Sequence, residues 1–413
     1  MNTIFFSSSF FSRISLALAA ALFGLTAVIS FAQEKPADAS PAPQAKDYLH
    51  IPVNIGIVPP LSVGNIAQMS SNKPIRSNIS LHLLCGVGNA VEGVDASMLF
   101  NVQSDYMNGV QAAGIINIVG GDAAWAQGAG VGNIVKGTFS GAQGAGVFNI
   151  TGNIQGAQGA GAFNISGDLE GAQGAGAFNI AGNARGIQGA GAVNVAKNVR
   201  GLQISGVSNH AEDVDGVQIS GILNTARNVT GAQISLINTA DNNQGVMIGL
   251  LSFSAAHGLH ADFWTDELRF IRLGLRTGNK GFYNLVTAGL QPFDGVTLWS
   301  VGYGLGVQIF VAPKDYIDIG AHTEGIFEGA NPGSWGFFGS INRLRFFYGH
   351  EFAKNFTVFL GPTLNWGLYT SPVAGAREPF GAISEDLVSL PWWSASQFAL
   401  SRVWIGVSGG FRF

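Results

Sequence analysis

Residues 141–185 read GAQGAGVFNITGNIQ, GAQGAGAFNISGDLE and GAQGAGAFNIAGNAR, three near-identical copies of one fifteen-residue unit. Three further copies and a shortened one extend the run to Gln244. Gln is third, Asn is ninth, and Asn or Asp is thirteenth. The columns are Gln143, Gln158, Gln173, Gln188, Gln203, Gln218 and Gln233; Asn149, Asn164, Asn179, Asn194, Asn209 and Asn224; and Asn153, Asp168, Asn183, Asn198, Asp213 and Asn228. A repeat of this length indicates supersecondary units that stack on one another, so it decides the architecture.

Each unit has the pattern of β-structure ending in a turn. Val217, Ile219 and Gly221 alternate with Gln218 and Ser220, which is a strand pattern. Gly-Asn and Gly-Asp pairs at the twelfth and thirteenth positions are typical of turns, because both residue types tolerate left-handed backbone. A helix is disfavoured, since each Gly would cost it about 1 kcal/mol relative to Ala.

We therefore predict a β-solenoid with one repeat per coil. Sixteen-residue copies at 93–108, 109–124 and 125–140 bring the total to about ten coils. Stacking would place Gln over Gln and Asn over Asn, in ladders of side-chain amides. We expect Gly and Ala on the inner positions, in a thin interior. In the alternative, each unit is one strand and turn of an up-and-down sheet or barrel, although the repeat offers no good lipid-facing side.

Composition narrows the functional classes. The net charge is −4, and the 21 Lys and Arg residues form no basic cluster, which argues against nucleic-acid binding. The single cysteine, Cys85, excludes an internal disulfide framework and a multi-cysteine metal site. Cys85 lies in an apolar segment, so we expect it to be packed rather than reactive.

The N-terminal region predicts export. Residues 1–32 have the pattern of a signal peptide, with Arg13 before an apolar stretch and Ser30-Phe31-Ala32 at the cleavage site. An uncleaved membrane anchor is the alternative. We expect a Pro/Ala-rich linker at 33–47, N-terminal strands or a cap at 48–92, the solenoid at 93–256 and a different β-domain at 257–413.

The last domain has long strands with strict alternation. One face carries Trp299, Val301, Tyr303, Leu305, Val307, Ile309 and Val311, and another carries Phe356, Val358, Leu360, Leu364, Trp366 and Leu368. We predict seven or eight strands from Phe263, the last at 403–413, in an antiparallel aromatic-rich sheet or small outer-membrane-type barrel. A soluble barrel or sandwich that uses the same faces for its own core is the alternative. The segment 371–399, with Trp392 and Trp393, predicts a long surface loop.

The order of these blocks resembles a known family. NISLHLLCGVGNAVEG (78–93) leads into the G-x-Q-x-x-G-x-x-N repeats, and HADFWTDE (260–267), GFYN (281–284) and VGYGLG (301–306) follow. The combination is similar to the bacterial surface repeat-containing proteins of spirochaete and Bacteroides-like envelopes, over about residues 76–310. The resemblance implies a cell-surface or outer-membrane location. It implies no activity and no site residues.

Few residues suggest chemistry. His257, His260 and Asp262 have the types and spacing of weak zinc ligands, but a structural junction between the two β-domains explains them better. Asp213 and Asp215 could flank a sugar, as acids do in polysaccharide-active β-helices, yet a solvated turn fits them better. We find no catalytic motif and expect no cofactor.

The sequence therefore predicts a non-enzymatic protein of the outer membrane or cell surface that acts as an envelope scaffold or recognition surface. A periplasmic or secreted location, a carbohydrate-active or carbohydrate-binding solenoid and a small barrel channel are the alternatives. The expected partner is the envelope itself, with a surface glycan or protein and no nucleic acid. For recognition, the fifteenth column and the Trp-rich tail fit best; the column is Gln155, Glu170, Arg185, Arg200, Asp215 and Thr230.

Overall fold

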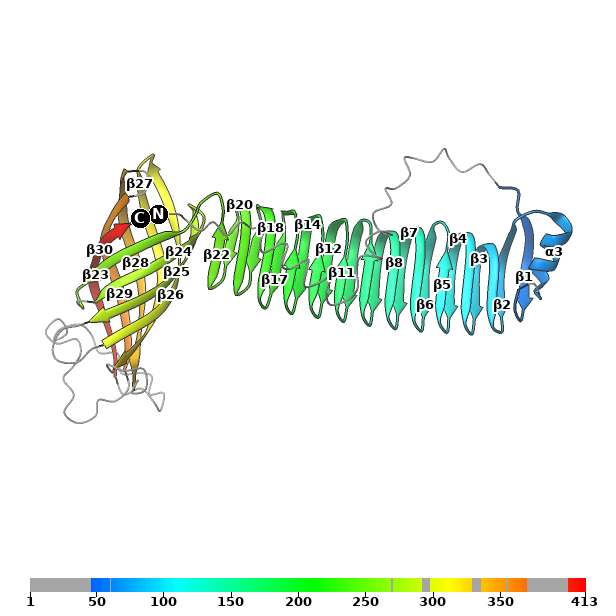
Figure 1. Cartoon of the computed structure of the whole chain (residues 1–413), viewed down its shortest axis with the longest axis horizontal. Coiled ribbons are helices and arrows are strands. Elements are labelled where there is room, and N and C mark those ends of the chain that lie inside the picture. The colour runs from blue at the N-terminus through cyan, green and yellow to red at the C-terminus, as the bar shows by residue number, and fades with distance from the viewer. Residues whose placement is uncertain are drawn as a thin grey trace, which may run out of the picture. The chain divides into compact units, whose positions relative to one another are not determined.

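The computed structural model describes residues 46–59, 61–268, 270–291, 298–328, 336–353, 356–369 and 400–413. The predicted signal peptide (1–32), most of the linker and the segment with Trp392 and Trp393 lie outside these residues. The chain is a parallel β-solenoid of about twelve turns followed by a closed antiparallel barrel of eight strands (Figure 1), so both parts of the predicted fold are confirmed. It divides into two compact units, Met1–Ser235 and Leu236–Phe413.

The first unit consists of coils that pair in parallel and in register. Gly156, Gln158 and Ala160 lie beside Gly171, Gln173 and Ala175 of the next coil. The up-and-down alternative is therefore wrong. The elements are β1 (Leu49–Gly56), α3 (Val63–Ser71), β2 (Ile75–His82), β3 (Cys85–Ser97), β4 (Phe100–Ala113), β5 (Ile116–Val119), β6 (Ala123–Ala129), β7 (Gly132–Ala145), β8 (Phe148–Ala160), β9 (Phe163–Ser166), β10 (Leu169–Ala175), β11 (Phe178–Ile180), β12 (Asn183–Ala190), β13 (Val193–Val195), β14 (Asn198–Ser205), β15 (Ser208–His210), β16 (Asp213–Val214), β17 (Val217–Ser220), β18 (Leu223–Val229) and β19 (Ala232–Ile234).

The solenoid begins earlier than predicted. β1 pairs in parallel with β2, and β2 with β3, so residues from Leu49 on are coils of the same ladder. The count of about ten coils was short for this reason. The same region contains the helix α3, which the sequence analysis missed. Ser62 caps its N-terminus by accepting a hydrogen bond from the Asn65 amide at 3.2 Å, and Asn72 ends it in a left-handed conformation.

The prediction that Gly and Ala face inward is wrong at the second and fourth positions of the repeat, although Ala residues such as Ala184 and Ala211 are buried. The interior holds the Gln and Asn columns, with Gln188, Asn179 and Asn194 fully buried, together with aliphatic residues such as Ile154 and Leu169. The predicted amide ladders are present inside the coil. Because identical coils stack in register, each buried amide finds a partner directly above or below it, which removes the usual cost of burying a polar group.

The two ladders run in opposite directions. Gln173 Nε2 donates to Gln158 Oε1 of the preceding coil at 2.8 Å. Asn164 Nδ2 instead donates to Asn179 Oδ1 of the following coil at 2.9 Å and also to the Gly174 carbonyl at 2.8 Å. The second bond fixes the Asn orientation, because only the amide nitrogen can donate to a carbonyl.

A buried carboxyl sets the direction of the Gln ladder. Gln103 and Gln111 both donate to Asp95 Oδ2 at 2.9 Å, and Gln127 then donates to Gln111 Oε1 at 2.7 Å. Burial raises the pKa of Asp95, while the hydrogen bonds from Gln111, Gln103 and Ser80 act in the opposite direction. Asp95 therefore ends the ladder at the first coils as an acceptor.

The second unit contains the last solenoid strands and the barrel. The solenoid strands are β20 (Ile237–Asn243), β21 (Val246–Ile248) and β22 (Leu251–Ser254). The barrel strands are β23 (His260–Asp266), β24 (Ile271–Gly278), β25 (Phe282–Gln291), β26 (Leu298–Ala312), β27 (Asp315–Glu328), β28 (Gly336–Ala353), β29 (Phe356–Tyr369) and β30 (Leu400–Arg412). Phe263 of β23 pairs with Phe411 of β30, which closes the barrel.

The connections define two ends of the barrel. Residues 279–281, 313–314 and 354–355 join strands at one end, here the turn end, where β23 also begins. β23, β25, β27 and β29 end, and β24, β26, β28 and β30 begin, at the other end of the barrel, here the loop end. In the described part of the chain, no helix is long and apolar enough to cross a membrane.

Candidate functional site

The barrel has an apolar outer surface. Along each strand, alternate residues point outward. Of the two apolar faces predicted from sequence, Trp299, Tyr303, Leu305, Phe356, Val358 and Leu368 are only partly exposed. Other outward apolar side chains, on these and the remaining described strands, are exposed by 37% to 65%. They are Phe263, Ile271, Leu273, Leu290, Val301, Val307, Ile309, Ile317, Ile319, Leu344, Phe346, Leu360, Leu364, Trp366, Ile405, Val407 and Phe411, here the apolar belt. A barrel that used these faces for its own core would bury them, so the soluble-core arrangement does not describe this chain.

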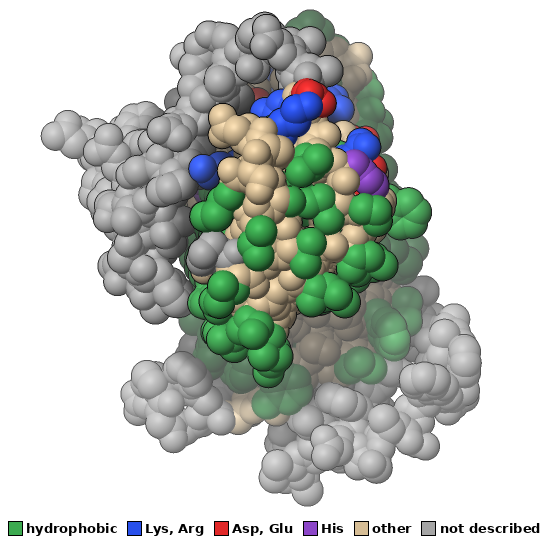
Figure 2. Space-filling model, turned by 90° about the vertical axis from the view of Figure 1, so that its right-hand side faces the viewer, with side chains coloured by type: hydrophobic (Ala, Val, Ile, Leu, Met, Phe, Trp, Pro, Cys, Tyr) green, Lys and Arg blue, Asp and Glu red, His purple; other side chains and the backbone are tan. Residues whose placement is uncertain are grey.

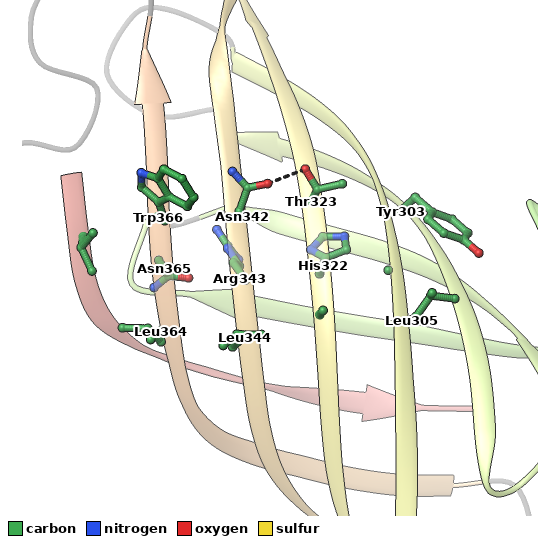
Figure 3. Close-up of a pocket in the computed structure, with 13 residues that line it drawn as sticks. Tyr303, Leu305, His322, Thr323, Asn342, Arg343, Leu344, Leu364, Asn365 and Trp366 are labelled. Carbon is green, nitrogen blue, oxygen red and sulfur yellow. Dashed lines mark hydrogen bonds between the residues drawn. The ribbon is translucent and has the colours of Figure 1, made fainter. Parts of the chain in front are cut away.

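One polar pair interrupts the belt. Thr323 Oγ1 donates to Asn342 Oδ1 across β27 and β28 at 2.9 Å, so the hydroxyl is paired with the amide oxygen (Figure 3). Leu344, Leu364 and Trp366 lie beside them on β28 and β29 (Figure 3). A hollow of about 900 Å³ runs along this part of the barrel, and its exposed lining is mostly apolar.

The inside of the barrel is charged. Five guanidinium groups and four carboxylates point inward from the described strands, and each residue is at most 9% exposed. They are Arg272, Arg276, Arg343, Arg345, Arg412, Asp262, Asp266, Asp318 and Glu324. Glu267, which is half-buried, accepts from Trp404 Nε1 at 2.8 Å at the loop end.

Near the loop end, two arginines share two acids. Arg272 binds Glu324 through two bonds, Nε to Oε1 at 2.7 Å and Nη2 to Oε2 at 3.0 Å, and it also donates to Asp266. Arg343 Nη1 donates to the same Asp266 Oδ2 at 2.6 Å. These residues come from β23, β24, β27 and β28, so the network links strands on opposite sides of the barrel. Two-bond guanidinium–carboxylate pairs are the strong and geometrically specific ones.

Near the turn end, a second network has the same chemistry. Arg412 binds Asp262 through Nε and Nη2, at 2.7 and 2.9 Å, and donates to the Tyr316 hydroxyl at 2.9 Å. Arg276 Nη1 donates to Asp318 Oδ2 at 2.9 Å, and the Tyr283 hydroxyl donates to the same carboxylate. Arg276 also lies over the Tyr283 ring, 3.2 Å from its centre. The barrel interior thus holds two networks of ion pairs beside buried apolar clusters around Phe270 and Trp264.

The outer surface of the barrel near the turn end holds the last solenoid coil. Asn284 of β25 donates to the Met247 carbonyl at 2.7 Å and accepts from the Gly249 amide at 3.1 Å. The Tyr303 hydroxyl donates to the Gly249 carbonyl at 3.0 Å, and Thr277 Oγ1 accepts from the Ser252 amide at 3.2 Å. Side chains of the barrel thus satisfy backbone groups that a further coil would otherwise bind.

The suggested metal ligands do not form a site. Asp262 is buried with both oxygens bonded to Arg412, and His257 Nδ1 lies 3.2 Å from the Ser254 hydroxyl. Burial, with a smaller contribution from Lys280, lowers the pKa of His257. His257 and His260 line a cavity of about 720 Å³ at the turn end, together with Arg276 and Arg412. Within the residues that the structure describes, no group of three or more His, Cys, Asp or Glu is placed to hold a metal.

The other candidates lie on coil surfaces. Asp213 accepts from Asn228 at 2.6 Å and Asp215 from Thr230 at 3.2 Å, so each acid bonds to the next coil. The fifteenth column is exposed throughout, from Gln155 to Thr230. Cys85 is half-buried with a free thiol.

The inward charges of the barrel were missed. A signal existed: Arg343 and Arg345, and Arg272 and Arg276, occupy the polar phase of strands whose other phase is apolar. The sequence analysis left open which phase would face inward and predicted no ion pairs there. The networks need β23 beside β30 and across from β27, which only closure of the barrel provides.

A scan of protein-family models found no match to the chain, and comparisons with curated proteins and with solved structures found no similar protein.

Proposed function

We propose that this chain is an exported, non-enzymatic outer-membrane protein in which the barrel is the membrane anchor and the solenoid is an envelope scaffold. One observation carries the proposal: the barrel exposes its apolar belt and buries its ions. In water this arrangement has two free-energy costs. The first is the exposure of aliphatic and aromatic surface to solvent, and the second is the desolvation of the buried charges. A lipid environment removes the first cost, and outer-membrane barrels have this inside-out pattern.

The lengths of five of the eight barrel strands support the proposal, while β23 and β24 have 7 and 8 residues. A bilayer is crossed by about 9 to 11 residues of a tilted strand. β26 to β30 have 15, 14, 18, 14 and 13 residues, so each is long enough to cross and to extend beyond the lipid. Closure also removes the free sheet edges that a bilayer does not tolerate.

The connections support an orientation. Outer-membrane barrels have short turns on the periplasmic side and longer loops outside. The chain enters β23 at the turn end, directly after the solenoid strand β22. In the proposed orientation the solenoid lies in the periplasm, and the loop end of the barrel faces the exterior.

A channel or an enzyme is less well supported. The barrel interior holds ion-pair networks and buried apolar clusters, and eight strands enclose only enough room for side chains. On the coils, Asp213 and Asp215 bond to neighbouring coils and do not form an open pair of acids. The scaffold role accounts for the in-register ladders, which stiffen the solenoid along its length.

Fractionation and gel migration test the anchor. We expect the protein in the outer-membrane fraction and, in detergent, a faster-migrating folded band that shifts on boiling. Recovery in the soluble periplasm would refute the anchor. For orientation, we expect Gln155→Cys, in a Cys85→Ser chain, to react with a membrane-impermeant thiol reagent only after the outer membrane is permeabilised. Labelling on intact cells would place the solenoid outside and contradict the orientation while leaving the anchor standing.

A further inference from the structure

Each coil of the first unit presents two outward residues, one on either side of the Gln column or of the position in register with it. In the repeat these are the second and fourth positions. Strand register aligns them over twelve coils. We name this surface the flat face. Its members are Val53 and Ile55, Ile79 and Leu81, Val94 and Ala96, Val110 and Ala112, Ala126 and Gly128, Ala142 and Gly144, Ala157 and Gly159, Ala172 and Gly174, Ile187 and Gly189, Leu202 and Ile204, Val217 and Ile219, and Ala232 and Ile234.

Every one of these positions holds Gly, Ala, Val, Ile or Leu, and none is buried. Among the larger side chains, Val110 is 49% exposed and Ile187 is 51% exposed. In the central coils the face is only Ala and Gly, and a Cβ added at Gly144 or Gly159 would meet no atom within 4 Å. The flat face is therefore apolar, uncharged and open along its whole length.

The β1 and α3 end of the first unit is also largely apolar. Figure 2 views the β1 and α3 end, where hydrophobic side chains are spread over the described surface and Lys, Arg, Asp and Glu gather at one edge. Val53 and Ile55, the first two members of the flat face, are 42% and 55% exposed. The apolar surface thus continues to the first coil.

The flat face is larger than the apolar patches that monomeric proteins usually expose, which indicates a binding partner. The length of the face is twelve coils at about 4.8 Å each, and its width is four residues at about 3.3 Å each. Its area is therefore on the order of 700 Å². Monomeric proteins rarely expose contiguous apolar patches larger than a few hundred Å². A stable protein–protein interface buries about 800 Å² on each partner. The flat face is close to that size.

We propose that the flat face packs against the flat face of a second copy of this chain, sheet on sheet. Small side chains let two sheets approach closely, and a surface without charge can be placed against itself without repulsion. A membrane surface fits less well, because segments that bind lipid surfaces carry Lys or Arg and aromatic residues, and this face has neither. This inference goes beyond the anchor and does not depend on it.

The test is the molar mass of the full-length protein in detergent micelles, measured by light scattering after size exclusion. We expect twice the mass of one chain for the wild type. Ala157→Lys places a charge on the flat face and should halve the mass. Gln155→Lys, two residues before Ala157 at an exposed position of the fifteenth column, which is not part of the flat face, is the matched control and should leave the mass doubled.

A wild type that stays at the mass of one chain at every concentration would overturn the proposal, as would an Ala157→Lys protein that stays doubled. Far-ultraviolet circular dichroism checks that the variant keeps its strands. If Ala157→Lys does not fold, the uncharged Ala172→Gln replaces it, with the same halving expected. Mass that falls to one chain when micelles are exchanged for lipid nanodiscs would assign the face to lipid and contradict a second copy.

Discussion

The column of glycines at the first position of the repeat offers the sharpest test of the coil geometry. Gly141, Gly156, Gly171, Gly186 and Gly201 have φ between 133° and 144°, a region that L residues rarely adopt. A Cβ at Gly156 would lie 2.0 Å from the Gly141 carbonyl oxygen of the preceding coil. Gly156→Ala therefore strains the backbone and separates two coils at the same time.

The expected cost follows from these two effects. Backbone strain at such φ values costs about 1–3 kcal/mol, and overpacking costs about another 1–3 kcal/mol. Gly156→Ala should thus destabilise its coil by about 2–6 kcal/mol. Gly159→Ala, three residues on, has no atom within 4 Å of the added methyl and no positive φ. It should be neutral or stabilising by up to about 1 kcal/mol.

Hydrogen–deuterium exchange read by mass spectrometry is the suitable assay, because stacked repeats need not unfold as one unit. In Gly156→Ala, peptides that cover 141–171 should exchange at least about 30-fold faster, at 1.4 kcal/mol per factor of ten. Gly159→Ala should leave the same peptides unchanged or slower. Equal exchange in the two variants would refute the reasoning, since composition alone does not distinguish the two glycines.

Three further predictions concern buried polar groups. Asp95→Asn should stabilise the protein at neutral pH. Burial raises the pKa of Asp95, so the folded wild type loses stability as the pH rises through that pKa, and Asn avoids this loss. Melting curves across pH should show the advantage of Asn vanish below about pH 4, where Asp is protonated in the unfolded chain as well. Asn194→Leu leaves the Ile204 carbonyl and the Asn179 amide without the bonds they make at 2.8 and 2.9 Å, so exchange should report a local loss of about 2–6 kcal/mol, and an unchanged rate would contradict the buried ladder. Arg412→Met should destabilise the barrel by about 3–5 kcal/mol and Arg412→Met with Asp262→Asn by clearly less, measured as the temperature at which the folded gel band disappears; equal losses would contradict the ion pair.

The period of the repeat was enough to predict stacked coils, and the Gln and Asn columns were enough to predict ladders. The repeat was not enough to predict which side of the sheet faces the interior of the solenoid. Alternation in Val217–Ser220 separates two sets of residues, but the usual preference for apolar interiors selects the wrong one. Gln218 and Asn224 are buried because coils in register pair every amide, and that cooperative benefit depends on the neighbouring coils rather than on one strand.

The N-terminal coils escaped prediction for a related reason. Residues 49–82 carry neither the Gln nor the Asn column, so no periodic signal links them to the later copies. Their strands join the ladder through backbone register, and His82 fills the space above Gly86 where the Asn column would continue. α3 was missed although Ser62 and Asn72 are residue types that cap the two ends of a helix.

The barrel strands were predicted well, because period-two alternation in segments such as 298–312 and 356–369 is strong. Which phase faced outward could not be derived from alternation alone, since a soluble core and a lipid surface both need one apolar side. The charged networks depend on contacts between β23, β24, β27 and β30, which are far apart in sequence and meet only when the barrel closes.

The central claim is that the apolar belt of the barrel lies in lipid, and a fluorophore placed on the belt tests it most directly. In a Cys85→Ser chain, Val407→Cys on the belt and Gln155→Cys on the solenoid are both exposed sites for the same probe. After reconstitution into vesicles, lipids with quenchers on their acyl chains should strongly quench the probe at position 407 and leave the probe at position 155 unquenched. Equal, weak quenching at both positions, with full quenching of both by a water-soluble quencher, would contradict the account.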